Sequence, residues 1–277
     1  MKKYLIASLM LASLNAFSQS YLILSNGVTL TTDRAGFIYD FGHFNVPYKV
    51  KINGGNFLVT SKKLSTIDKN GLLFEKDVEV EEIKGKGLNY FIRDDNRLFT
   101  IDENGFVYEY EDDIKVFKKA LGFGGNYFTV KPENKKMNVD LYTVNNTGNY
   151  FKLKVDGLNP ADITSHGGSY FQTKEGIIYT VSKAGFVFPK TEMKTGEIKK
   201  AGGNFFIDSN NFLYTVSEEG LLILPILPAN IVVADIVKIG ANYMLDSSGR
   251  IFVVDQNGEM FERTVTHNLS SAKILSL

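Results

Sequence analysis

The stretch Ala201–Pro225, AGGNFFIDSNNFLYTVSEEGLLILP, decides the fold because related phrases recur along the whole chain. It holds a Gly-Asn turn, an aromatic segment, a polar turn, a second apolar segment and a turn that ends in glycine. Similar phrases begin at Gly54, Gly87, Gly124, Gly167 and Gly240. A phrase that returns at a regular interval predicts a repeat architecture.

Two anchors count the copies. The first is the glycine before the last strand of each copy, spaced 34 to 43 residues apart: Gly36, Gly71, Gly105, Gly148, Gly185, Gly220 and Gly258. The second is an Asn or Ser before an aromatic residue: Ser20, Asn56, Asn89, Asn126, Ser169, Asn204 and Asn242. Both anchors give seven copies, and residues 19–277 divide into about 37 residues per copy, within the usual range for such repeats.

Each copy is predicted to form four short strands. In the copy around Asn204 these are Glu197–Gly202, Phe205–Asp208, Phe212–Val216 and Leu221–Leu224. Their cores are apolar at consecutive positions, which indicates burial on both faces of the sheet. Asn204 lies in the first turn, where an Asn is expected to accept a left-handed backbone.

Four-stranded units of this length predict an all-β, seven-bladed β-propeller. Ser20–Leu24 matches a second strand with no first strand before it, and Ser270–Leu277 matches a first strand with no second strand after it. We therefore expect the C-terminal strand to complete the N-terminal blade, so that residues 19–277 form a single domain. Six or eight blades, a linear solenoid and an outer-membrane barrel are the alternatives, and strand length and alternation disfavour the barrel.

Residues 1–18 are predicted to be a signal peptide. Lys2 and Lys3 precede the short apolar run 4–14, and Ala16 and Ser18 fit a cleavage site. The run is too short for a transmembrane helix of about 20 residues. We therefore expect an exported protein, periplasmic or secreted, that does not span a membrane.

The composition excludes several classes of function. The 31 basic and 31 acidic residues balance, so no general field attracts nucleic acid. The absence of cysteine excludes disulfides, thiolate nucleophiles and Cys-ligated metals. No cofactor motif is present, and no cofactor is expected.

The phrase at Ile198–Val216, IKKAGGNFFID followed by LYTV, resembles the propeller repeats of the RCC1 type and, less closely, those of the tectonin type. Both families place a glycine turn between their first two strands. The chain lacks the Gly-Gln-Leu-Gly ending of RCC1-type repeats and the tryptophans of tectonin repeats. The resemblance therefore implies a propeller fold and transfers no functional residue.

Candidate chemical sites are weak. Asp68, Asp102 and Asp255 each open a tetrad that ends in Asn-Gly, which indicates a hairpin turn more than a calcium loop, because calcium needs about six oxygen ligands. His43, His166 and His267 lie in different copies without metal-ligand spacing. His166 precedes a Gly-Gly turn and is expected to be able to face the central channel.

Two stretches depart from the repeat and are the predicted binding residues. The loop 131–138 extends one hairpin and contains Lys135 and Lys136, and long loops on a rigid scaffold often bind partners. The alternative is a solvated insertion without a partner, which is the commoner case for such loops. The run 221–233, LLILPILPANIVV, replaces charges of the other copies with apolar residues such as Leu224 and Ile226. It either exposes an apolar patch or folds onto its own blade, with its prolines blunting the sheet edge.

The sequence thus favours a non-catalytic protein-binding or scaffold module with a protein partner, predicted to be monomeric. The alternatives are a carbohydrate-binding propeller and, third, a hydrolase or lyase with its site in the central channel. Most of the 14 Tyr and 21 Phe are expected in the core rather than on a sugar-stacking surface. Aromatic side chains exposed in several blades would favour carbohydrate, and an asymmetric apolar patch would favour a protein partner.

Overall fold

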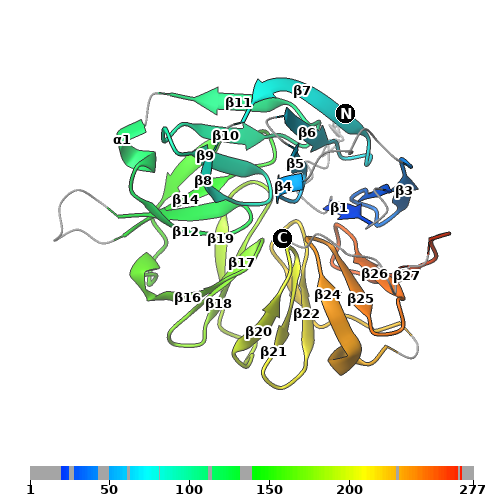
Figure 1. Ribbon diagram of the computed structural model, residues 1–277. Helices are drawn as coiled ribbons and strands as arrows, with labels where there is room; N and C mark the ends of the chain where they lie inside the picture. Colours follow the sequence, from blue (N-terminus) through cyan, green and yellow to red (C-terminus); the bar gives the residue numbers. More distant parts are fainter. Residues whose placement is uncertain are drawn as a thin grey trace, which may run out of the picture.

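Seven small antiparallel sheets follow one another around a ring in a computed structural model of the chain. Figure 1 shows them in chain order, with the last sheet returning to the side of the first. The structure describes residues 20–24, 28–42, 50–60, 63–80, 82–111, 114–131, 139–228, 231–267 and 269. Within these residues, the one α-helix is a single turn, which is too short to cross a membrane.

The sheets are the blades of a seven-bladed propeller, and we number them in chain order. Blades 1 to 3 consist of β1 (Ser20–Ile23), β2 (Thr29–Thr32) and β3 (Ile38–Asp40); β4 (Val50–Asn53), β5 (Phe57–Thr60), β6 (Lys63–Ile67) and β7 (Leu73–Glu79); and β8 (Ile83–Lys86), β9 (Tyr90–Arg93), β10 (Leu98–Ile101) and β11 (Val107–Tyr110). Blades 4 and 5 consist of β12 (Ala120–Phe123), β13 (Tyr127–Val130), β14 (Asp140–Val144) and β15 (Tyr150–Leu153); and β16 (Ile163–His166), β17 (Tyr170–Thr173), β18 (Ile178–Val181) and β19 (Val187–Lys190). Blades 6 and 7 consist of β20 (Ile198–Ala201), β21 (Phe205–Asp208), β22 (Leu213–Val216) and β23 (Leu222–Ile223); and β24 (Ile236–Ile239), β25 (Tyr243–Asp246), β26 (Ile251–Val254) and β27 (Met260–Arg263).

The predicted blade pattern is confirmed. The copy around Asn204 forms β20 to β23, each within two residues of its predicted bounds, and neighbours in the sequence are neighbours in the sheet. Short helical turns, α1 (Ile114–Phe117), η1 (Pro160–Asp162) and η2 (Val233–Asp235), lie in the connections between blades. Blade 1 begins at a second strand, as expected, and has three strands among the described residues. The predicted closing strand, Ser270–Leu277, lies outside them.

The two middle strands of each blade form the core. They are rich in Phe, Tyr, Val and Thr, residues that suit a pleated surface, and nearly all their side chains are buried on both faces. Residues from the first and last blades share one core cluster, including Leu22 and Leu30 with Tyr243 and Val253. The ring is therefore closed by packing of blade 7 on blade 1.

The prediction for the Asn of the first turn is wrong. In the part of the chain that the structure describes, the non-glycine residues with positive φ are Asn96 and Asn211, which lie in the turn between the second and third strands of their blades. Asn56 is buried instead, and its side-chain amide donates to the carbonyl of Asp102 in the next blade at 3.4 Å. The first-turn Asn residues therefore connect blades rather than relieve a strained turn.

A threonine in the third strand joins each of the first six blades to the next. Its hydroxyl donates to the carbonyl of the turn glycine in the following blade over 2.5 to 2.9 Å. The pairs are Thr31–Gly71, Thr66–Gly105, Thr100–Gly148, Thr143–Gly185, Thr180–Gly220 and Thr215–Gly258. All six threonines are fully buried, so each hydrogen bond is made away from water.

The seventh blade-to-blade contact uses different chemistry. Val253 takes the place of the threonine, and Arg263 Nε donates to the carbonyl of Gly36 at 2.6 Å. The same guanidinium lies over the rings of Phe37 and Phe261, at 5.1 and 4.7 Å from their centres. Arg263 therefore supplies the contact between the last blade and the first that threonine supplies elsewhere.

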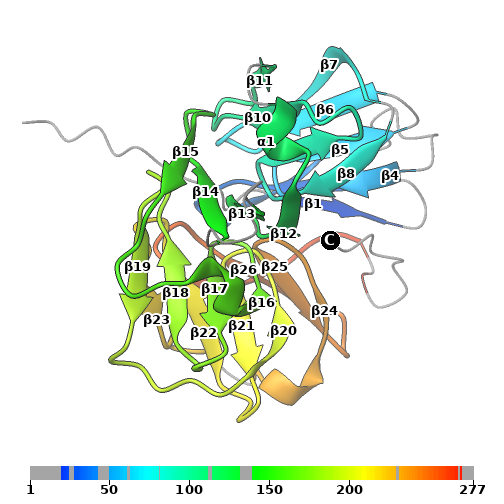
Figure 2. The ribbon, with the colours of Figure 1, turned by 90° about the vertical axis from the view of Figure 1, so that its left-hand side faces the viewer.

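The blades stack their four strands along the axis of the ring. In Figure 2 the fourth strands β15, β19 and β23 lie on the left and the first strands β16, β20 and β24 lie on the right. The turns between third and fourth strands hydrogen-bond from blade to blade through backbone groups, as from Lys69 N to Glu103 O. One side of the ring is therefore formed by the fourth strands, and we call it the fourth-strand face.

Candidate binding face

The fourth-strand face carries a ring of exposed apolar side chains. The first residue after each turn glycine and the residue two positions later point out of the blade, while the residue between them packs into the core clusters. Ten large apolar side chains on this face are between 37% and 61% exposed. They are Phe37, Tyr39, Leu72, Phe74, Phe106, Tyr108, Phe151, Phe186, Phe188 and Leu221, and we call them the apolar annulus.

The exposure follows from the position of the fourth strand. It is the last strand of each sheet, so its side chains have a neighbour on one side only, and Phe106 and Tyr108 lie open where Phe99 on the third strand is covered. The exposed parts add up to about 900 Å², taking about 200 Å² for a whole aromatic side chain. The largest apolar patch on a typical monomer is about 300–600 Å².

Exposed side chains of neighbouring blades contact one another in the annulus. Lys76 Nζ lies 5.2 Å from the ring centre of Phe74 in its own blade and 5.4 Å from that of Phe106 in the next. Tyr39 of blade 1 packs on Gly71 of blade 2, where any side chain would meet its ring. The annulus is thus continuous from blade 1 to blade 3, and blade 7 contributes none of its ten side chains.

A polar centre lies inside the annulus. It consists of the second residue of each turn between third and fourth strands: Arg34, Lys69, Glu103, Asn146, Lys183, Glu218 and Gln256. In six of the seven blades, from blade 2 round to blade 7, the backbone N–H of this residue donates to the carbonyl of the corresponding residue in the next blade, so that the series runs from Lys69 to Arg34. The seven side chains therefore surround the axis of the ring.

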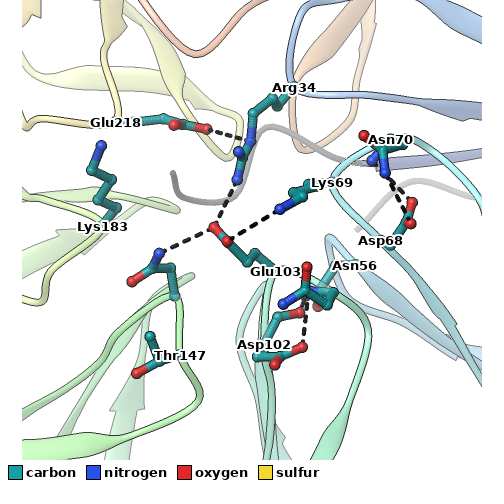
Figure 3. Close-up of polar contacts among 12 residues, drawn as sticks. Arg34, Asn56, Asp68, Lys69, Asn70, Asp102, Glu103, Thr147, Lys183 and Glu218 are labelled. Carbon is teal, nitrogen blue, oxygen red and sulfur yellow. Dashed lines mark hydrogen bonds and ion pairs between the residues drawn. The ribbon is translucent and has the colours of Figure 1, made fainter. Parts of the chain in front are cut away.

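Arg34 joins opposite sides of this centre (Figure 3). Its guanidinium contacts Glu103 of blade 3 at 2.9 Å and Glu218 of blade 6 at 3.8 Å. Glu103 also accepts from Asn146 Nδ2 at 3.1 Å and lies 3.7 Å from Lys69 Nζ. The two converging carboxylates are thus paired with cations, whereas acid–base catalysis needs one carboxyl group held neutral or free to take a proton.

The run 221–233 places apolar residues on the outer rim of blade 6. Ile226 is 95% exposed and Leu224 is 54% exposed. Leu227 and Val232 nearby are exposed to a smaller extent. We call residues 224–228 the blade-6 rim; its Leu224 and Ile226 side chains are exposed, and its two prolines are half-buried.

Pro225 explains why this segment leaves the sheet. Ser217 N donates to Leu221 O, so these two residues form a hydrogen-bonded pair between β22 and β23. Hydrogen-bonded pairs alternate along antiparallel strands, so residues 215 and 223 form the next such pair and residues 213 and 225 would form the one after it. Pro225 has no N–H to give there, and β23 ends at Ile223. Pro189 in β19 stands opposite Tyr179, at a position that makes no such bond, and that strand continues to Lys190.

The Asp-Asn-Gly tetrads are turns. Asp68 Oδ1 accepts from the backbone N–H groups of Asn70 and Leu72 at 2.9 and 2.8 Å, and Gly71 has a φ of +79°. Asp102 and Asp255 repeat the arrangement. Across the described residues, no group of three His, Cys, Asp or Glu residues has the geometry of a metal site.

A cavity of about 200 Å³ lies at the other end of the axis, on the side of the first strands. It is lined by glycine turns of blades 3 to 6 together with Lys86, Phe123 and His166. His166 therefore does face the channel mouth, as the sequence allowed. Its Nδ1 lies 3.2 Å from the hydroxyl of Tyr127, and burial lowers its pKa. Among the described residues no carboxylate bonds to it, so the partner that a catalytic base needs is not found there.

Of the predicted binding residues, Leu224 and Ile226 are exposed on the blade-6 rim. Lys135, Lys136, His43 and the predicted signal peptide lie outside the described residues. The annulus and the polar centre were not anticipated. A signal for the centre exists in the sequence, because the residue two positions before each turn glycine is polar in every copy.

Comparisons with known proteins found similar chains among solved structures, all at low identity. No family model matches the chain, and no curated protein matches it. Among solved structures, a streptogramin B lyase has 16% identity and a TM-score of 0.31, covering 91% of this chain and 95% of its own. A catalytically inactive virginiamycin B lyase from Staphylococcus aureus has 14% identity and a TM-score of 0.24, covering 91% and 87%.

BamB from Moraxella catarrhalis has 13% identity and a TM-score of 0.25, covering 85% of this chain and 81% of its own. At these identities and TM-scores, the comparisons assign neither an activity nor a partner to the chain. The resemblance to RCC1-type and tectonin-type repeats stays a prediction.

Proposed function

We propose that this protein is an exported, non-catalytic binding module, a single propeller of residues 19–277, that holds a protein partner on the blade-6 rim. The observation that carries the proposal is the exposure of Ile226 and Leu224, at 95% and 54%. The corresponding stretches of other blades, such as EKDVEVEE after Phe74, are charged.

The rim has the features of an anchor for a protein. Pro225 and Pro228 restrict the backbone of the segment, so less conformational entropy is lost when a partner binds it. Ile226 projects from a segment that has left the sheet and can enter an apolar pocket, as binding hot spots do. It lies at one blade only, which gives the ring a single asymmetric apolar site.

The catalytic alternative receives less support from the described residues. The two carboxylates at the polar centre are paired with Arg34, and His166 bonds to a tyrosine. Neither arrangement offers a nucleophile or a base with its orienting partner.

The test is a pull-down with the tagged, exported protein from envelope and culture supernatant, with proteins and glycans both identified in the eluate. We expect a reproducible protein partner that is lost when Leu224→Glu and Ile226→Glu are combined. The matched control is Leu121→Glu with Val237→Glu, because both residues are exposed apolar side chains on first strands and their loss leaves the rim intact. Equal recovery by the rim variant and the parent would contradict the proposal.

Carbohydrate binding is the second candidate, and the annulus favours it. Aromatic side chains such as Tyr39, Phe106 and Tyr108 are exposed in five blades, as a surface for stacking sugar rings requires. Recovery of glycan without protein in the same pull-down, lost on Phe106→Ala and Phe186→Ala, would place this candidate first.

A further inference from the structure

The apolar annulus is large enough to be an interface. Its exposed apolar area of about 900 Å² exceeds the roughly 800 Å² that each partner contributes to a stable interface of standard size. The charges inside it are already paired within the chain, as Arg34 is with Glu103. Covering this face therefore buries apolar area without leaving those ions unpaired.

The shape of the surface points to a second copy as its occupant. Two identical rings placed face to face match in outline. A two-fold axis that lies in the plane between them and passes through one blade sets every blade of one copy against a blade of the other. Closed two-fold contacts of this kind are the commonest in homo-oligomers. Seven such axes exist, one through each blade, and the side chains distinguish among them.

The axis through blade 2 pairs opposite charges at the polar centre. It places blade 1 against blade 3, blade 5 against blade 6 and blade 4 against blade 7. Arg34 then faces Glu103 of the second copy, and Lys183 faces Glu218 of the second copy. Lys69 on the axis faces its own counterpart, and Glu103 lies beside it at 3.7 Å in each copy.

The same axis also matches the annulus. The first exposed position of the fourth strand is apolar in five blades and polar in two, Asn149 in blade 4 and Glu259 in blade 7. The axis through blade 2 sets these two polar residues against each other, where the amide of Asn149 can donate to the carboxylate. All five apolar positions then meet apolar positions. The axis through blade 4 also pairs opposite charges, but it sets Glu259 against Phe37.

We propose that the fourth-strand face is a homodimer interface in which two copies stack face to face about a two-fold axis through blade 2. The proposal replaces the monomer expected from the sequence. It leaves the blade-6 rim at the outer edge of the ring, so it stands independently of the proposed protein partner.

The oligomeric state is measured by sedimentation equilibrium of the full chain between 1 and about 100 μM. We expect a dimer whose dissociation constant rises at least about 100-fold on Phe106→Glu, because the two-fold axis puts the changed residue into the interface twice. Leu121→Glu, at 57% exposure on the first strand β12, is the matched control and should leave the dimer unchanged. A parent protein that stays monomeric, or equal behaviour of the two variants, overturns the proposal.

The axis is tested by single cysteines, because the chain has none of its own. Leu72 lies in blade 2 on the axis, so Leu72→Cys should form a disulfide-linked dimer under mild oxidation. Leu221 faces Phe186 of the second copy, so Leu221→Cys should remain uncrosslinked alone and crosslink when mixed with Phe186→Cys. Crosslinking of Leu221→Cys alone, or none by Leu72→Cys, overturns the axis. A monomer that binds glycan on the annulus overturns the dimer itself.

Discussion

Replacing Thr180 with valine removes one blade-to-blade hydrogen bond and keeps the shape of the side chain. The hydroxyl of Thr180 is fully buried and donates to the carbonyl of Gly220 at 2.6 Å. A buried hydrogen bond contributes about 0.5–1.5 kcal/mol, and an acceptor left without a donor costs about 1–3 kcal/mol. We therefore expect Thr180→Val to lower the free energy of unfolding by about 1–2 kcal/mol, and the melting temperature by about 2–4 °C for each kcal/mol.

The seventh contact between blades provides a rescue for this variant. There Val253 stands at the threonine position and Arg263 donates to Gly36. Lys190 occupies in blade 5 the place of Arg263 in blade 7, since each pairs with the first residue of the third strand. Lys190→Arg added to Thr180→Val should therefore recover about half or more of the lost stability, as a hydrogen bond to a guanidinium contributes about 1.5–3 kcal/mol.

The assay is urea unfolding of the parent, both single variants and the double variant, which together form a double-mutant cycle. Lys190→Arg alone should change stability by less than about 0.5 kcal/mol, as most surface substitutions do. If Thr180→Val unfolds at the parent's urea concentration, the threonine contacts do not stabilise the ring. If the cycle shows no coupling, the equivalence of Lys190 and Arg263 is wrong.

Two further predictions concern the axis of the ring. Gly168→Ala should cost at least about 3 kcal/mol in urea unfolding, because the added methyl carbon would lie 2.0 Å from the carbonyl oxygen of Gly203 in the next blade. Gly157→Ala, where nothing lies within 4 Å, should cost only the roughly 1–2 kcal/mol of its positive φ, and equal costs would exclude the close approach of the blades. Burial lowers the pKa of His166 from its usual 6.5, so its contribution to stability is present above about pH 6.5 and is lost as the pH falls. His166→Asn should therefore lose less stability than the parent between pH 7 and pH 5, and an equal loss would assign the pH dependence to other groups.

The propeller could be predicted because its signals are local and repeat. Each turn glycine has a positive φ, as Gly71 and Gly220 show, and such a position strongly selects glycine. The middle strands are buried on both faces, so runs such as Phe205–Ile207 are apolar without a break. Seven repetitions of these local requirements made the blade count readable without any long-range contact.

The exposed annulus could not be predicted, because the fourth strands are also apolar on both faces. In Phe106-Val107-Tyr108, the valine packs into the core and both aromatic residues are exposed. The sequence pattern of such a strand equals that of a buried one. Only its place as the last strand of the sheet, with no strand beyond it, separates the two cases.

The ion pairs of the polar centre were inaccessible for another reason. Each of its residues occupies an equivalent turn, so the repeat reveals the set. The partners do not follow from the repeat, because Arg34 passes over blade 2 to reach Glu103 and over blade 7 to reach Glu218. Such pairing depends on the length of one side chain across the axis, and sequence spacing carries no record of it.

The arginine contact between blade 7 and blade 1 has a consequence for the order of folding. Six threonine contacts join residues 39 to 48 positions apart, whereas Arg263 and Gly36 are 227 positions apart. The longer loop adds about 1.5 kcal/mol of closure entropy, at about 0.6 kcal/mol for each doubling of length. We therefore expect the blades to assemble first as an open array and its two ends to meet last. Arg263 stabilises this last contact with a charged hydrogen-bond donor that also lies over two aromatic rings.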